Sequence, residues 1–172
     1  MIGVVFSCGS RSRIDKEIRD FHHVRVTLPL DSMINLSTKG NISSYEQAKN
    51  IYVVYVDSTS CSDCAINHLS DWSQLDIISN GDNSLLKYLF IIAPPRGQYT
   101  HVAEQVAKDT SFNEFVFIDT ANVFERSNPA LPTNKLLHTF LLNSQRQVEI
   151  IGSPLTNVRI KEMLMKLLEQ EK

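Results

Sequence analysis

Two cysteines three residues apart, Cys61 and Cys64, are the strongest chemical signal in the sequence. They lie in STSCSDCAINHL (residues 58–69), directly after the apolar run IYVVYVD (51–57). The first turn of a helix has unpaired N–H groups and the positive end of the helix dipole, so a thiolate placed there is stabilised. A spacing of three puts the second sulfur one turn along, within disulfide reach. We therefore expect Cys61 to attack a substrate disulfide and Cys64 to resolve the mixed disulfide.

A metal clamp is an alternative use of the same cysteines. His68 follows Cys64 by four residues on the same helical face, and His138 could approach from a loop. Zn²⁺ takes four such ligands, or three with an open position, and Cu(I) also binds thiolates. Dithiol exchange is the leading hypothesis, because His68 is expected to face solvent.

The elements that must position the cysteines alternate between apolar strands and amphipathic helices. Strands are predicted at 24–28, 51–57, 85–93, 114–119, 136–143 and 146–152. Helices are predicted at 64–78 and 100–109, as a short segment within 121–135, and from about residue 156. This order predicts an α/β fold with a mixed, mostly parallel central sheet, helices on both faces, and a C-terminal β-hairpin plus helix.

The chain resembles the thioredoxin-like superfamily, and in particular the membrane-anchored branch typified by TlpA and ResA. The resemblance covers about residues 50–170 and rests on YVVYVDSTSCSDC, on the strand FVFID, and on HTFLLNSQRQVEIIG. It implies a thiol–disulfide oxidoreductase that acts on protein thiols and disulfides without a bound cofactor. It also implies that Cys61 is the exposed nucleophile and that Cys64 is the more buried resolver.

Three positions depart from the pattern of that family. Ser60 stands where an aromatic residue usually precedes the first cysteine, and Ser62 and Asp63 replace the usual Gly-Pro between the cysteines. The slot of a cis-proline before TFL holds Leu137 or His138. Asp63 opposes thiolate formation, whereas the helix dipole favours it. A second hypothesis is therefore a catalytically weak thioredoxin-like binding module, or a Cu- or Zn-binding protein, of the bacterial envelope.

Three further polar residues carry predictions near the motif. If the family geometry holds, His138 lies close to Cys61 and accepts its proton, or else it is a partly buried histidine bonded to the backbone. Asp57 ends the first core strand, where it either relays a proton for Cys64 or, as we favour, holds the turn. Asp119 ends its own strand and is expected to cap the segment after that strand.

The N-terminal sequence VVFSCGS resembles the end of a lipoprotein signal, with Cys8 as the lipidated residue. The residues before Cys8 are too few for a complete signal, so either the signal is truncated here or the match is chance and this stretch is a short apolar tail. We interpret residues 1–23 as a truncated signal and tether, and residues 24–172 as the thioredoxin-like domain. This organisation predicts a periplasm-facing, lipid-anchored protein, with a cytoplasmic location as the alternative.

The bulk composition excludes one class of partner. The chain has 172 residues and a formal net charge of −2, and its Lys and Arg residues are scattered rather than clustered. No basic stripe of the kind that binds nucleic acid is present. The length suits one domain with a sizeable core.

Overall fold

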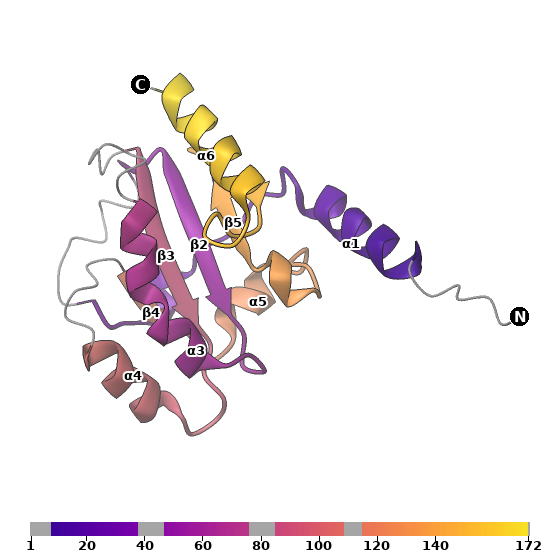
Figure 1. Ribbon diagram of the computed structural model, residues 1–172. Coiled ribbons are helices and arrows are strands. Elements are labelled where there is room, and N and C mark those ends of the chain that lie inside the picture. Colours follow the sequence, from indigo (N-terminus) through magenta and orange to yellow (C-terminus); the bar gives the residue numbers. More distant parts are fainter. Residues whose placement is uncertain (1–7, 38–46, 76–84, 109–114, 172) are drawn as a thin grey trace, which may run out of the picture.

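The computed structural model describes residues 8–37, 47–75, 85–108 and 115–171. In this part of the chain a six-stranded sheet lies at the centre, with helices packed on both faces (Figure 1). The strands are β1 (Ile34–Asn35), β2 (Asn50–Val56), β3 (Leu86–Ile92), β4 (Phe115–Ile118), β5 (Thr139–Leu142) and β6 (Val148–Ile151).

The described helices are α1 (Cys8–Phe21), α3 (Ser62–Asn67), α4 (Tyr99–Lys108), α5 (Val123–Ser127) and α6 (Val158–Gln170). Short 3₁₀ segments add η1 (Leu30–Ser32), η2 (Leu69–Leu75) and η3 (Lys135–Leu137). No described helix is long and apolar enough to cross a lipid bilayer.

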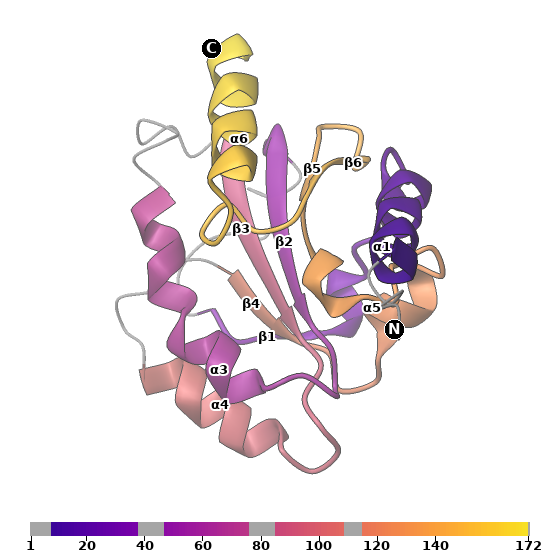
Figure 2. The same ribbon diagram turned by 45° about the vertical axis from the view of Figure 1, so that its right-hand side comes forward.

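The sheet is mixed, with the order β1-β4-β3-β2-β5-β6. The three inner strands β2, β3 and β4 are parallel, whereas β5 is antiparallel to β2 and β6 is antiparallel to β5. β6 therefore runs in the same direction as the inner strands, and β1 and β5 run against them. A mixed sheet with a C-terminal hairpin and a final helix confirms the predicted fold class (Figure 2).

Two apolar clusters, one on each face of the sheet, make up the core. The first lies under α3, η2, α4 and α6 and includes Ile66, Trp72, Val102 and Leu164. The second lies under α5 and the end of α1. β2 and β3 are buried almost throughout because both of their faces are covered, which explains their nearly continuous apolar sequences.

The strand predicted at 24–28 is wrong. Only Arg25 forms a ladder-type bridge, to Gln147, although the backbone of residues 23–26 does bond to the outer edge of β6 through residues 146–148. This segment covers an edge that would otherwise expose unpaired N–H and C=O groups. At the opposite edge of the sheet, β1 pairs with β4. β1 was not predicted from the sequence.

The helix predicted at 64–78 is also partly wrong in its described portion, since α3 ends at Asn67 and a 3₁₀ segment follows. Leu69, Trp72 and Leu75 are all buried, and they are spaced by three residues. In a 3₁₀ helix residues three apart lie on one side, so the 3₁₀ form points all three side chains at the sheet.

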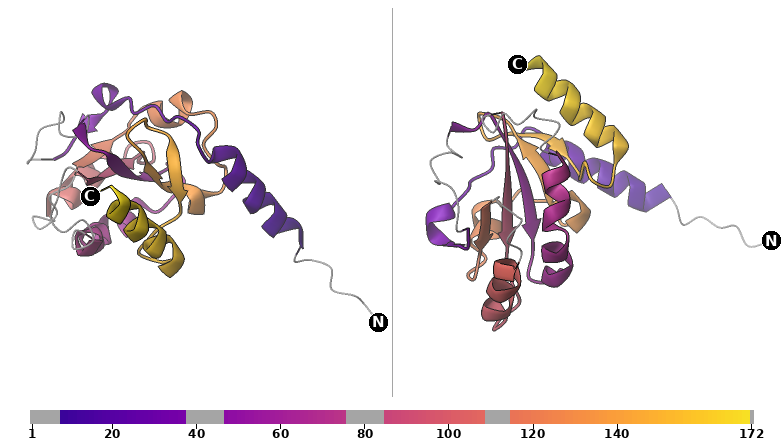
Figure 3. Two further views of the ribbon diagram at one scale, coloured as in Figure 1. Left: turned by 90° about the horizontal axis from the view of Figure 1, so that it is seen from above. Right: turned by 60° about the vertical axis from the view of Figure 1, so that its left-hand side comes forward.

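The last turn of α1 packs on the domain, while its beginning extends away from the sheet (Figure 3). Phe21 is almost fully buried and contacts Phe140 of β5 edge to face, with ring centroids 5.0 Å apart. The segment predicted as a tether thus ends in a core residue. Its anchoring role stays a prediction.

Candidate functional site

Cys61 and Cys64 form a disulfide between the end of β2 and the start of α3. Cys61 is the N-cap of α3, its Cα lies 5.3 Å from that of Cys64, and its sulfur accepts a hydrogen bond from the Cys64 N–H at 3.2 Å. In the reduced protein, a thiolate on Cys61 would still accept this hydrogen bond from the Cys64 N–H. The placement between strand and helix matches the prediction for the motif.

Both cysteines are exposed at the surface. That Cys64 is the more buried of the two stays a prediction. The positions of α3 that face the core are Ser62 and Ile66, which are one turn apart. This orientation directs Asp63 and Cys64 outward. Both residues of the disulfide therefore lie at the surface of the protein.

Asp57 holds the turn that leads from β2 to Cys61. Its Oδ1 accepts from the N–H of Thr59 at 2.8 Å, from the Thr59 hydroxyl at 2.7 Å and from the Ser60 hydroxyl at 3.2 Å. Lys135 from the opposite loop lies 3.2 Å from the same oxygen and also donates to the Thr59 hydroxyl. The turn-holding role favoured for Asp57 is confirmed. Ser60, in the slot of the missing aromatic residue, contributes to it.

The pKa of the Asp57 carboxyl is lowered by these contacts. Burial alone would raise it, but the hydrogen bonds from Thr59 and Lys135, together with the charge of Lys135, outweigh burial. Asp57 is therefore a carboxylate at neutral pH. Lys135 could not be found from the sequence, because it is separated from Thr59 by 76 positions and belongs to no motif.

His138 lies at the end of η3, immediately before β5, in the slot where the family resemblance places a proline. It is buried, its Nε2 bonds to the Pro132 carbonyl at 2.8 Å, and its Nδ1 lies 3.7 Å from Asp57. Nε2 must be the donor in the bond to Pro132, since a carbonyl only accepts. Nδ1 has no hydrogen-bond partner in the described structure.

The contacts of His138 match the backbone-bonded alternative. Within the described residues, neither of its ring nitrogens forms a hydrogen bond to the sulfur of Cys61. His138 lies close to Asp57, which holds the turn before the motif. Its direct role as proton acceptor for Cys61 stays a prediction that no contact supports.

An ion pair that was not predicted from the sequence lies on the other side of the disulfide. His101 of α4 places Nε2 3.0 Å from Oδ1 of Asp63, the residue just before Cys64. The pair joins two helices that pack against each other. His101 falls within the predicted helix 100–109, but only the packing of α4 on α3 reveals its partner.

His68, the other candidate ligand, is exposed and pairs with Asp71 at 2.8 Å. This confirms that it faces solvent. Among the described residues, no group of three or more His, Cys, Asp or Glu side chains is arranged to hold a metal ion. Asp119 behaves as predicted, since it accepts from the N–H groups of Ala121, Val123 and Phe124 at the start of α5.

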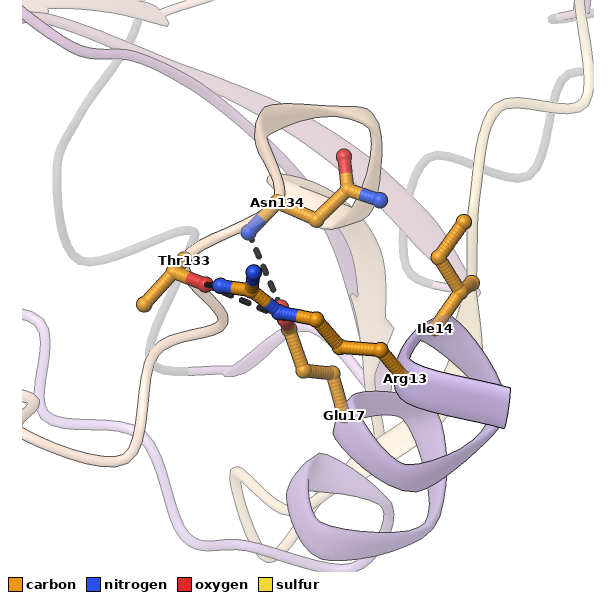
Figure 4. A pocket seen from close by; sticks show the side chains of 5 residues that line it. All are labelled: Arg13, Ile14, Glu17, Thr133 and Asn134. Atoms are coloured by element: carbon orange, nitrogen blue, oxygen red, sulfur yellow. Dashed lines mark hydrogen bonds and ion pairs between the residues drawn. The ribbon is translucent and has the colours of Figure 1, made fainter. Parts of the chain in front are cut away.

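A pocket between α1 and the loop before η3 is lined by Arg13, Ile14, Glu17, Thr133 and Asn134 (Figure 4). Glu17 accepts from the Asn134 N–H at 2.9 Å and from the Thr133 hydroxyl at 3.0 Å. The bond from the Asn134 backbone is the main reason that the pKa of Glu17 is lowered. Glu17 thus fixes α1 to the loop that carries Lys135.

The fold of this site is that of thioredoxin-like proteins. No family model matches the sequence and no curated protein matches it. Structural similarity was found to the copper-bound ScoI of Arabidopsis thaliana, with a TM-score of 0.51, 11% identity, and 81% of this chain and 96% of that chain covered.

Two further solved structures give the same picture. The bacterioferritin comigratory protein of Xanthomonas campestris, studied for alkyl peroxide reduction, has a TM-score of 0.52, 11% identity, and 85% of this chain and 97% of that chain covered. A thioredoxin-like protein from Porphyromonas gingivalis has a TM-score of 0.51 and 14% identity, and the match covers 85% of this chain and 92% of that chain. At such low identity the similarity establishes the thioredoxin-like fold alone.

Proposed function

We propose that this protein is a thiol–disulfide oxidoreductase that exchanges disulfides with other proteins through Cys61 and Cys64. The observation that carries the proposal is the solvent-exposed disulfide at the start of α3, with the Cys61 sulfur bonded to a backbone N–H. An exposed sulfur can be attacked, and a backbone donor stabilises the thiolate that exchange produces. The thioredoxin-like fold is consistent with this chemistry.

The exchange proceeds in two substitutions at sulfur. A substrate thiolate attacks the Cys61 sulfur, a substrate–Cys61 bond forms, and Cys64 leaves as a thiolate with the electron pair of the broken bond. A second substrate thiolate then attacks the substrate sulfur of the mixed disulfide, and Cys61 leaves as a thiolate. The substrate thiolates lose two electrons as they become a disulfide, and the protein disulfide gains those two electrons. The two resulting cysteine thiolates can then each take up a proton. The reverse sequence reduces a substrate disulfide.

We further propose that the protein works in the bacterial envelope, facing the periplasm and anchored by a lipid on Cys8. The support is the VVFSCGS sequence, together with the oxidising compartment in which surface disulfides persist. Metabolic labelling with a fatty acid tests the anchor, in cells that express the protein from its own gene so that any signal residues upstream of this sequence are included. Label on the wild type and none on Cys8→Ser is expected, and an unlabelled wild type would end the anchoring proposal.

The exchange proposal is tested by an insulin-reduction assay with dithiothreitol as electron donor. Cys61→Ser is expected to lower the rate to the uncatalysed background. Cys8→Ser is the matched control, since it also removes one thiol, and its rate should equal that of the wild type. Cys64→Ser should retain a trapped mixed disulfide on Cys61, visible by mass spectrometry. Wild-type activity in Cys61→Ser would end the proposal.

A second candidate function is Cu(I) binding by the reduced cysteines. It is favoured by the structural similarity to a copper-bound ScoI and by the surface position of both cysteines. Thiolates are suitable ligands for Cu(I). Titration of the reduced protein with Cu(I) against a competing chelator distinguishes the two functions. One tightly held copper that is lost in both Cys61→Ser and Cys64→Ser would establish binding.

A further inference from the structure

We propose that His101 is a positioning residue that makes the reactivity of the cysteines depend on pH through its ion pair with Asp63. The proposal rests on the proposed dithiol chemistry, and it concerns the stability of a thiolate at Cys61. Its basis is the arrangement of one carboxylate and one imidazole beside the disulfide, on two helices that contact each other.

Asp63 lies inside the motif, in the first turn of α3 between the cysteines. A carboxylate at this position repels a thiolate that forms on a neighbouring cysteine. His101 places Nε2 3.0 Å from Oδ1 of Asp63 and, when protonated, cancels much of that repulsion. A protonated imidazole therefore favours the thiolate, whereas a neutral imidazole leaves the carboxylate charge exposed.

Both side chains of the pair are about half exposed, at 48% for His101 and 55% for Asp63. Protons therefore reach the pair directly from solvent. An imidazole changes charge in the interval from about pH 5 to pH 8, in which thiol reactivity also varies. The pair can consequently act on the thiol in ordinary buffers, and its energy should be modest because water screens it.

The elements that carry Asp63 and His101 also carry other ionisable side chains, which lie on α4, on the segment before α4, or on the segment after α3. α4 carries Glu104 and Lys108, Arg96 precedes α4, and His68 and Asp71 pair with each other beyond α3. In the described residues, no ion pair links any of these five side chains to Asp63 or His101. On the opposite side of the motif, the charge of Asp57 is matched by Lys135. His101 is therefore the partner of Asp63.

The test measures the alkylation rate of Cys61 by iodoacetamide in the reduced protein carrying Cys64→Ser, at pH 6 and at pH 8. His101→Gln removes the titrating charge and should slow alkylation roughly threefold at pH 6, with less than about 1.5-fold change at pH 8. His101→Lys keeps a positive charge at both values. It should match the wild type at pH 6 and exceed it about threefold at pH 8.

His68→Gln is the matched control, because it breaks a similar histidine–aspartate pair close to the motif. It should leave both rates unchanged. A merely structural bond between α3 and α4 would lower the melting temperature of His101→Gln, yet would leave the ratio of the pH 6 and pH 8 rates at the wild-type value. That result, or an equal effect of His68→Gln, would overturn the proposal.

The outcome is independent of the test of disulfide exchange. Alkylation needs only a reactive thiol, so a protein that failed to reduce insulin could still show the His101 effect. A protein that reduced insulin, but showed no His101 effect on alkylation, would retain the proposed function and lose this inference.

Discussion

Asp57 and Asp63 flank the cysteines, and they are held in opposite ways. Asp57 is buried and accepts hydrogen bonds from Thr59 and Ser60, with Lys135 as a permanent counter-charge. Asp63 is more than half exposed and has one described partner, a histidine. The first carboxylate is tied to the backbone of the turn before Cys61, whereas the described partner of the second belongs to a neighbouring helix.

The difference separates two tasks that a reactive disulfide requires. A buried carboxylate with several donors keeps its charge over a wide pH range, so it can hold the turn before Cys61 in one geometry. An exposed carboxylate paired with an imidazole is screened by water and contributes little to stability, so it is free to serve another purpose. The hydrogen bonds of Asp57 hold the shape of one side of the motif, and our proposal assigns control of charge to the other side.

Asp57→Ala should have the largest effect on stability, about 2–3 kcal/mol in the free energy of unfolding, because it leaves several donors and Lys135 without their acceptor. Urea denaturation with the disulfide intact measures it. Asp71→Ala is the control, since it removes an exposed carboxylate and should cost less than about 0.5 kcal/mol. Equal losses in the two variants would contradict a structural role for Asp57.

Lys135→Met should lower the free energy of unfolding by less than Asp57→Ala does, by about 0.5–1 kcal/mol at pH 7, because the lysine is partly exposed. The cost should depend on pH. The pKa of Asp57 is lower in the folded than in the unfolded protein, so its charge stabilises the fold above the unfolded pKa of about 3.9. That contribution is lost as the pH falls through the lowered folded pKa.

The difference in the free energy of unfolding between wild type and Lys135→Met should therefore become smaller below about pH 4. Urea denaturation at pH 7 and at pH 3 measures the two values. Lys108→Met, on the exposed surface of α4, serves as a control without a carboxylate partner among the described residues. A cost for Lys135→Met that stays constant between the two pH values would show that Asp57 is not its electrostatic partner.

Asp63→Asn should have the smallest effect on stability, within about 0.5 kcal/mol of the wild type, because both members of its pair are exposed. The same substitution should raise the alkylation rate of Cys61 at pH 8, because it removes a negative charge that opposes the thiolate. A loss of stability comparable to that of Asp57→Ala would show that the two sides of the motif do not differ as we infer.

The strands and the motif were predictable because they are local features of the sequence. IYVVYVD and LLKYLFIIA read as buried strands, and the position of Cys61 after the first of them follows from the residue order alone. The spacing of three between Leu69, Trp72 and Leu75 fits the 3₁₀ segment η2, although a single continuous helix was predicted over 64–78.

The partners of the two carboxylates were not predictable from the sequence. Lys135 and His101 are separated from the motif by whole strands and helices, and they carry no spacing that indicates a partner. His138 shows the same limit, because its bond to the Pro132 carbonyl depends on how the loop closes before β5. The order of burial of the two cysteines was inferred from a family pattern and stays a prediction, while the orientation of α3 places both of them at the surface.

The position of β2 in the sheet has a consequence for motions of the backbone. β2 is paired along its seven residues with β3 and over four of them with β5, so its amides belong to the most enclosed ladder of the described structure. Such amides exchange with deuterium only when a large part of the fold opens. Reduction of the disulfide should therefore speed exchange in the turn around Cys61 and leave β2 at its original, slow rate.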